Sequence, residues 1–324
     1  MPLPTDEQLI ANAKEVIALF HQAFGPHPGF RPGHAKGQLV RGTFVPTKAA
    51  GDLSRAEHFH APSTPVTVRF SNSTGLPLIP DGDPHAEPRG AALRFHLADD
   101  KTTGHRRHTD VIGHSVPAFP ARNGVEFAHF LRAIGGSEAE LGAYLEKNPP
   151  AKTFLTYPKP LTQSFATTPY FALTAYKFVN KDGKETYIRY ELEPVAGIHT
   201  LPEGTDVKGL DPEYLFKELA TRLKAGTAAA AAAQGPIKFK LVAQLANEGD
   251  PTDDISLQWS QAGHRKVELG TVTLETLVDD NATEQKHVIF DPIPRVDGIE
   301  PSADPMLEFR AAVYLLSGRE RRAA

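Results

Sequence analysis

The segment TPVTVRFS, residues 64–71, carries the pattern that decides the fold. Apolar and polar side chains alternate along it, so each kind points to one face of an extended strand. The apolar set is Val66, Val68 and Phe70, and the polar set is Thr67, Arg69 and Ser71. Similar segments are GAALRFHL at 90–97, YIRYELEP at 187–194, IKFKLVAQL at 237–245 and VELGTVTL at 267–274. Short alternating strands separated by turn residues indicate an antiparallel sheet or barrel rather than βαβ units.

Helical periodicity occurs on both sides of these strands. It predicts an amphipathic helix at 5–24, with Thr5 and Gln8 as a capping box, and further helices at 124–135, 137–148 and 211–225. In the third of these helices, Ser137 and Glu140 form a second capping-box pair. The low-complexity segment TAAAAAAQG at 227–235 is typical of a helix tail or a surface loop.

The last predicted helix starts at Asp304, a good N-cap, followed by Pro305, which suits the first helical position. Met306, Arg310 and Tyr314 follow at intervals of four residues, so they share one face. Because no linker divides the chain, we expect one α+β domain over 1–324. Its parts would be an N-terminal helix at 1–25, a barrel with inserted helices at 26–300 and a C-terminal helix at 301–324.

The composition excludes several classes of function. With 35 Lys+Arg against 39 Asp+Glu, the charge is nearly balanced, which argues against nucleic acid and membrane surfaces as partners. The start, MPLPTDEQLI, shows no secretory signal, so we expect a cytoplasmic protein. The absence of cysteine excludes disulfides, thiolate catalysis, iron–sulfur clusters and cysteine-ligated haem.

Five ordered motifs give the chain a family resemblance that runs from Arg31 to about Arg322. They are RPGHAKG at 31–37, VRFSNSTG at 68–75, PRGAALRF at 88–95, DVIGHSVPAF at 110–119 and DPMLEFRAAVYLLSGRERR at 304–322. In these motifs the sequence resembles the catalase superfamily, and especially its small catalase-related peroxidases. The resemblance implies an antiparallel β-barrel of catalase type with surrounding helices and a haem b cofactor.

On one side of that haem, the resemblance makes His34 the distal catalytic histidine and Ser71 its hydrogen-bond partner. A neutral imidazole can take a proton from one peroxide oxygen and give it to the other. Arg69 would meet a haem propionate, because guanidinium pairs well with carboxylate. Outside their motifs, these residues would be interpreted as a surface histidine and an exposed strand face.

On the other side, Tyr314 matches the family's proximal iron ligand. Arg310, one turn earlier, would favour its phenolate form by its positive charge. The resemblance also makes Arg31 and Arg321 propionate ligands and lets Phe127 stack on the haem. Each assignment has an alternative. Tyr314 and Arg310 could be a core tyrosine beside a surface arginine, Arg321 could belong to a basic tail, and Phe127 could be a core phenylalanine.

The chain departs from large catalases at His114, where they carry a distal asparagine that orients peroxide. Imidazole there favours peroxidase activity over oxygen release, unless His114 only packs against the barrel wall. The long arm and extensions that large catalases use for tetramer threading and NADPH binding are also missing, so we expect neither.

We therefore expect a haem peroxidase that reduces hydrogen peroxide or organic hydroperoxides with an unidentified small-molecule electron donor. Some catalase side activity and a homodimer follow from the resemblance. The first alternative is an isomerase of fatty-acid hydroperoxides, like the superfamily's allene oxide synthases, which needs no reducing donor. The second is a non-catalytic haem-binding protein, which would not react with peroxide.

Overall fold

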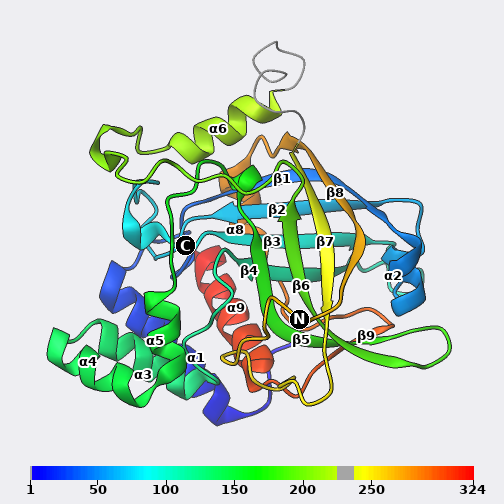
Figure 1. Ribbon diagram of the computed structural model, residues 1–324, viewed down its shortest axis with the longest axis horizontal. Helices are drawn as coiled ribbons and strands as arrows, with labels where there is room; N and C mark the ends of the chain where they lie inside the picture. The colour runs from blue at the N-terminus through cyan, green and yellow to red at the C-terminus, as the bar shows by residue number, and fades with distance from the viewer. Residues whose placement is uncertain (1, 225–236) are drawn as a thin grey trace.

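The computed structural model describes residues 2–224 and 237–324, and it contains a closed antiparallel barrel (Figure 1). The predicted low-complexity segment 227–235 lies outside the described residues. Around the barrel the strands follow the order β4-β3-β2-β1-β8-β7-β6-β5, and β5 pairs with β4 to close it. Their bounds are β1 Gly37–Pro46, β2 Thr64–Ser71, β3 Gly90–Leu97, β4 Arg107–His114, β5 Tyr170–Val179, β6 Glu185–Pro194, β7 Ile237–Leu245 and β8 Lys266–Leu277. A short strand, β9 (Ile299–Pro301), pairs with β5 outside this ring.

In the part of the chain that the structure describes, one residue pair joins β4 to β5 and closes the barrel, His114 opposite Phe171. The neighbouring pairs β3–β4 and β5–β6 run over seven or more residues. The register of β5 against β6 shifts between Ala172 and Tyr176. The seam of the barrel is therefore its least regular part, and His114 lies on it.

The interior of the barrel is packed with apolar side chains. Val66, Val68 and Phe70 are buried there, as their alternation predicted, and the Phe70 ring stacks on Phe165 with centroids 5.2 Å apart. Thr67, Arg69 and Ser71 point to the outer face, where they are buried as well. The barrel wall is covered on this side, so both faces of β2 are shielded from water.

Helices cover that outer face. In Figure 1, α1, α3, α4 and α5 gather with α9 on one side of the barrel, and α9 lies next to the strands. The helices are α1 Glu7–Phe24, α2 Lys48–Leu53, α3 Gly124–Ile134, α4 Glu138–Lys147, α5 Pro149–Thr156, α6 Tyr214–Leu223, α8 Asn281–His287 and α9 Pro305–Ala323. Short 3₁₀ turns are η1 Glu57–Phe59, η2 Pro84–Ala86, η3 Phe165–Thr167 and η4 Val207–Gly209. Over the described ranges, no helix has both the length and the apolar character that crossing a membrane requires.

The predicted helices are confirmed, with one correction at the first cap. Asp6, not Thr5, caps α1, because its carboxylate accepts hydrogen bonds from the amides of Gln8 and Leu9. The capping box of Ser137 and Glu140 is present in α4. The sequence did not predict the short helices α2, α5 and α8, whose length is too small for a helical period to show.

Helix α9 begins as predicted, with the Asp304 carboxylate accepting from the amide of Met306. Burial raises the pKa of this carboxyl to about 6, although the Met306 hydrogen bond and the charge of Arg310 oppose the shift. The N-cap of α9 therefore titrates nearer to neutral pH than an exposed carboxyl does.

Replacing Asp304 by asparagine tests this titration, since asparagine keeps the cap acceptor but cannot ionise. The folded state holds the Asp304 proton more tightly than the unfolded chain, so its contribution to stability is present below about pH 4 and is lost as the pH rises through 6. Between about pH 4 and pH 7, Asp304→Asn should lose less unfolding free energy than the wild type, by on the order of 2 kcal/mol. Urea unfolding curves measure this. Asp280→Asn, at the exposed N-cap of α8, is the control, and an equal pH dependence in both variants would contradict the assignment.

Candidate active site

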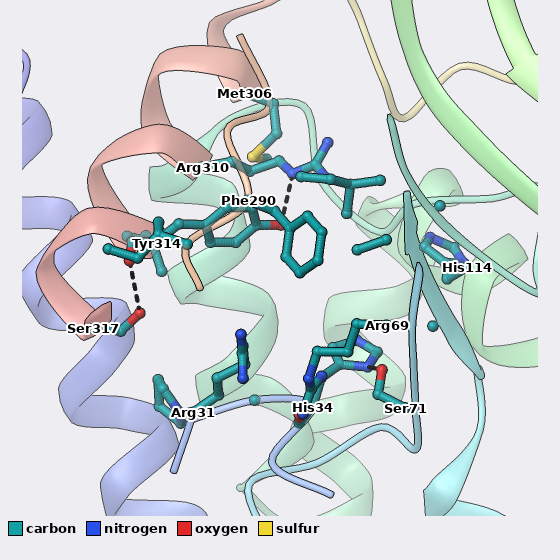
Figure 2. A pocket seen from close by; sticks show the side chains of 18 of the residues that line it. Arg31, His34, Arg69, Ser71, His114, Phe290, Met306, Arg310, Tyr314 and Ser317 are labelled. Atoms are coloured by element: carbon teal, nitrogen blue, oxygen red, sulfur yellow. Dashed lines mark hydrogen bonds between the residues drawn. The ribbon is translucent and has the colours of Figure 1, made fainter. Parts of the chain in front are cut away.

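A cavity of about 260 Å³ lies between the outer wall of the barrel and helices α1, α3 and α9 (Figure 2). Every residue that the sequence selected for the site lines it; these are Arg31, His34, Arg69, Ser71, His114, Phe127, Arg310, Tyr314 and Arg321. The structure thus brings together positions that are up to 290 residues apart, from Arg31 to Arg321. Most other lining side chains are apolar, so these few polar groups determine what the cavity can bind.

His34 lies on the loop that precedes β1, and its imidazole Nδ1 is 3.1 Å from the hydroxyl oxygen of Ser71 on β2. The backbone of His34 has φ +55°, in the left-handed region that a non-glycine residue rarely adopts. The next residue, Ala35, donates its amide to the carbonyl of Thr74, which holds the loop against the chain after β2. Strain of this kind is tolerated where surrounding contacts fix the backbone, as they do here.

The His34 imidazole is neutral at neutral pH. Desolvation in the cavity, followed by the positive charge of Arg69, lowers its pKa to about 4. Arg31 and Arg310 act in the same direction, while a backbone hydrogen bond at Asn72 opposes the shift. With Nδ1 bound to Ser71, Nε2 is the ring nitrogen left to exchange a proton with a bound molecule.

Tyr314 lies on the opposite wall, on α9, one turn after Arg310 (Figure 2). The Arg310 Nε donates a hydrogen bond of 3.1 Å to the phenol oxygen of Tyr314, and Nη1 donates to Thr174 on β5 at 3.1 Å. Burial alone would lower the pKa of Arg310, but interaction with Tyr314 and Tyr176 outweighs it and raises that pKa. The guanidinium is therefore a permanent cation beside the phenol oxygen.

Three further arginines enter the cavity without an acidic partner. Arg31 and Arg321 both donate to the carbonyl of Val288, at 3.0 and 2.9 Å. Arg69 donates to the carbonyls of His34 and Ala35. Across residues 2–224 and 237–324, none of the three forms an ion pair with a carboxylate.

Burying these arginines close together lowers the pKa of each of them. Desolvation, with the charges of Arg69 and Arg321, lowers the pKa of Arg31 well below its usual range. Desolvation and Arg321 lower the pKa of Arg69 to about 9, and desolvation and Arg322 lower that of Arg321 to about 10. A ligand with two carboxylates would relieve this repulsion by charge-assisted hydrogen bonds.

His114, at the barrel seam, lines the cavity rather than only packing on the wall. Its Nδ1 accepts a hydrogen bond of 3.3 Å from the amide of Val116, so the neutral ring carries its proton on Nε2. Desolvation, followed by the charges of His34 and Arg310, lowers its pKa to about 3. His114 is therefore an uncharged N–H donor near neutral pH.

Phe127 of α3 is both a lining residue and a packing residue. Its ring stacks on Phe119 with centroids 5.5 Å apart and also contacts Phe20 of α1 and Phe130. The two interpretations of Phe127 from the sequence are thus compatible, because one face of an aromatic cluster forms part of the cavity wall.

Sequence reasoning missed the segment that follows β8. Gln285 of α8 accepts hydrogen bonds from the Nε and Nη2 of Arg69, and Val288 supplies the carbonyl shared by two arginines. Phe290 also lines the cavity. The sequence feature that could have predicted α8 is Asp280, which caps this helix by accepting a hydrogen bond from the amide of Thr283.

Comparisons with known proteins find relatives over nearly the whole chain. Residues 29–324 match the model of the catalase family. The catalase-related peroxidase of Mycolicibacterium paratuberculosis (strain ATCC BAA-968 / K-10) is 36% identical over 307 residues, which cover 92% of this chain and 90% of that protein. The catalase-related peroxidase of Synechococcus elongatus (strain ATCC 33912 / PCC 7942 / FACHB-805) is 30% identical over 317 residues, which cover 95% of this chain and 88% of that protein.

Among solved structures, a fungal catalase superposes with a TM-score of 0.77 at 22% identity. The match covers 99% of this chain but 63% of the fungal protein, so the chain spans a little under two thirds of that longer catalase. A bacterial catalase gives the same TM-score at 21% identity. The expected catalase-type barrel with surrounding helices is thereby confirmed.

Gly90 makes the contact between His34 and Ser71 possible. A Cβ atom at this position would lie 2.5 Å from the Ser71 hydroxyl oxygen and 3.1 Å from the His34 Nδ1. Gly90→Ala should therefore break the hydrogen bond and displace the imidazole, and a crystal structure of the variant would show this. Gly142→Ala is the control, because a Cβ on this helical glycine meets nothing within 4 Å. An unmoved imidazole with an intact hydrogen bond in Gly90→Ala would contradict the prediction.

Proposed function

The chain belongs to the catalase family, and from this premise we propose that it is a haem peroxidase. It would reduce hydrogen peroxide or organic hydroperoxides with electrons from a small-molecule donor, with catalase activity as a side reaction. One observation carries the proposal. A serine-bound imidazole and an arginine-bound phenol face one apolar cavity from opposite walls, beside three arginines without carboxylate partners in the described chain.

The residues of the cavity fit haem b. Arg31, Arg69 and Arg321 would hold the two propionates, which supply the negative charge that these guanidinium groups lack. The phenol oxygen of Tyr314 would bind the iron, and the apolar walls, with Phe127 among them, suit the macrocycle. When bound, the haem iron would supply the redox chemistry for cleaving the O–O bond of a peroxide.

Arg310 would prepare Tyr314 for this role. A phenol binds a metal well only as the phenolate, and the adjacent guanidinium balances that negative charge. The Arg310 side chain is itself held by Thr174, so its position does not depend on the ligand. The pair would fix one oxygen atom in one place on the wall of α9.

His34 would act as the acid and base. Neutral at physiological pH, its Nε2 would accept the proton from the first peroxide oxygen and then deliver it to the second. Ser71 keeps the ring in the orientation that leaves Nε2 available. This places the proton transfer on the wall opposite Tyr314.

His114 would orient the peroxide as a hydrogen-bond donor. Its Nε2–H offers one uncharged N–H, as the side-chain amide of the asparagine in large catalases does. The imidazole is bulkier than that amide, which would disfavour a second peroxide and so favour an external donor. We therefore assign His114 to substrate orientation.

The experiment that tests the function follows hydrogen peroxide and organic hydroperoxide with and without a small aromatic donor. A peroxidase oxidises the donor in proportion to the peroxide that disappears. Consumption of a fatty-acid hydroperoxide without any donor would instead support an isomerase. A haem-loaded protein that leaves both peroxides intact would contradict the proposal.

Tyr314→Phe should fold but retain little or no haem, because the variant loses the one oxygen that would anchor the iron. Tyr176→Phe is the matched control: this tyrosine is buried close by, its hydroxyl donates to the carbonyl of Pro292, and it should keep full haem occupancy. The absorbance ratio of haem to protein after purification measures both. Full occupancy with an unchanged spectrum in Tyr314→Phe would exclude it as the ligand.

His34→Ala should bind haem normally yet react with hydrogen peroxide about 10²–10⁴-fold more slowly, since the acid–base group is gone. In the wild type, the rate should fall on the acid side with an apparent pKa well below 6.5, nearer 4, because protonated His34 cannot accept a proton. Stopped-flow absorbance across pH measures both effects, with the exposed His129→Ala as control. An unimpaired rate in His34→Ala rules out this role.

A further inference from the structure

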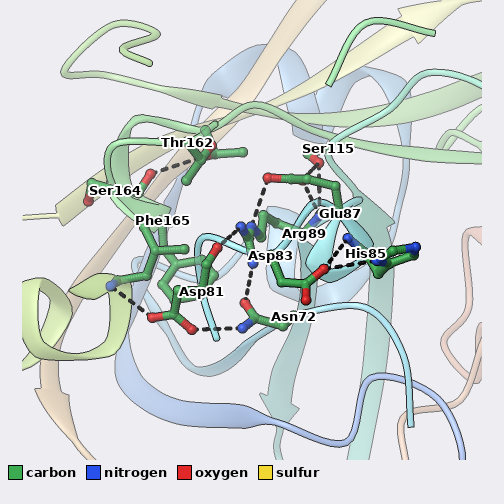
Figure 3. Close-up of polar contacts among 12 residues, drawn as sticks. Asn72, Asp81, Asp83, His85, Glu87, Arg89, Ser115, Thr162, Ser164 and Phe165 are labelled. Atoms are coloured by element: carbon green, nitrogen blue, oxygen red, sulfur yellow. Dashed lines mark hydrogen bonds and ion pairs between the residues drawn. The ribbon is translucent and has the colours of Figure 1, made fainter. Parts of the chain in front are cut away.

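A polar cluster lies behind the cavity wall and centres on Arg89, whose side chain is fully buried (Figure 3). Its Nε donates to the Glu87 carboxylate at 2.8 Å, and its Nη1 donates to the side-chain oxygen of Asn72 at 2.6 Å. Its Nη2 donates to the carbonyl of Asp81. One planar guanidinium thus joins three segments of the chain.

Two partners of Arg89, Asn72 and Ser115, are chain neighbours of residues that line the cavity. Asn72 directly follows Ser71, and Arg89 itself directly precedes Gly90. Ser115, which directly follows His114, accepts a hydrogen bond of 2.9 Å from the Arg89 amide and donates its own amide to the Arg89 carbonyl at 2.8 Å. The ends of β2, β3 and β4 are therefore fastened to one another behind the site.

The same cluster reaches the loop that carries His34. Asp81 accepts hydrogen bonds from the Asn72 amide group at 2.7 Å and from the Lys36 ammonium at 2.8 Å. Lys36 lies two residues after His34, and its carbonyl accepts from the backbone amide of Asn72. His34, Ser71 and His114 are therefore each followed, within two residues, by a member of the cluster. These members are Lys36, Asn72 and Ser115.

The charges of this cluster are balanced, in contrast to those of the cavity. Lys36 pairs with Asp81 and Arg89 pairs with Glu87, and all four side chains are nearly or fully buried. The cluster therefore needs no ligand to balance its charges. Such groups, which orient the residues around a metal without touching it, typically change activity by about 10–100-fold when mutated.

We propose that Arg89 is a positioning residue that sets the geometry between His34, Ser71 and His114. Its guanidinium acts through Asn72 and through Glu87, whose carboxylate also accepts a hydrogen bond from the Ser115 hydroxyl. It touches neither substrate nor cofactor. The proposal rests on the proposed function for its kinetic consequence, but the geometric claim stands on the cluster alone. A lysine at this position could keep the pair with Glu87, but its single nitrogen cannot also reach Asn72 and Asp81 in the fixed fork of arginine.

Arg89→Lys tests the proposal in the haem-loaded protein. Haem affinity and the optical spectrum should match the wild type, because Tyr314 and the three cavity arginines are untouched. The rate with hydrogen peroxide and the association rate of cyanide should each fall about 10–100-fold. Cyanide is a useful probe because it binds as an anion. Hydrogen cyanide must first give up its proton, which His34 would accept. The acid limb of both pH profiles should also move, which a loss of stability alone would not cause.

Arg222→Lys is the matched control. Arg222 is a buried arginine on α6 that pairs with Glu218 through its Nε and Nη2, away from the cavity. Its substitution should change neither rate nor either pH profile. Equal effects in Arg89→Lys and Arg222→Lys would overturn the proposal. If Arg89→Lys does not fold, Ser115→Ala decides. It removes the hydroxyl that accepts from the Arg89 amide and donates to Glu87, and it should change the rates in the same direction.

A second measurement separates this proposal from the function on which it rests. In the cofactor-free protein, ¹⁵N chemical shifts of the His34 ring report whether Nδ1 still bonds to Ser71. We expect that bond in the wild type and its loss in Arg89→Lys. If the wild type does not react with peroxide, the proposed function fails while this result still tests Arg89. An unchanged His34 spectrum in Arg89→Lys contradicts the positioning role, whatever the activity.

Discussion

Uncompensated positive charge is the constraint on which the site depends. Arg31, Arg69 and Arg321 point into one apolar cavity, and the described chain offers them carbonyl oxygens and Gln285 but no carboxylate. Burying like charges together destabilises the fold, as the lowered pKa values of all three show. A dianionic cofactor would remove that cost. Its binding should therefore stabilise the folded protein, because the unfolded chain cannot assemble the three arginines.

The barrel and the helices supply the two halves of this site. Strand β2 places Arg69 and Ser71 on its outer face, since Val66, Val68 and Phe70 must fill the interior. Helix α9 supplies Arg310, Tyr314 and Arg321 along one face and packs against α1. Behind the His34 wall, the charges of the cluster around Arg89 are balanced within the chain itself. One set of charges would thus receive the cofactor, and the other set would hold the residues that act on substrate.

Much of this arrangement could be predicted, because it follows from the periodic spacing of residues within single strands and helices. Alternation in 64–71 predicts which side chains fill the barrel and which face the site, and four-residue spacing predicts the shared face of Met306, Arg310 and Tyr314. The barrel seam at His114 and Phe171 could not be predicted, since pairing between distant strands depends on register. The contact between Arg89 and Ser115 could not be predicted either, because it also depends on the register of distant strands. Asp6 displaced Thr5 as the first cap because two nearby acceptors compete for the same amides.

Tyr314 is the proposed ligand of the haem iron, on the wall opposite His34. Resonance Raman spectroscopy of the haem-loaded protein tests it most directly, with excitation in the phenolate-to-iron charge-transfer band. We expect ring modes of an iron-bound tyrosinate in the wild type and their absence from Tyr314→Phe reconstituted with excess haem. A spectrum typical of imidazole-ligated haem, or tyrosinate modes that persist in Tyr314→Phe, would contradict it.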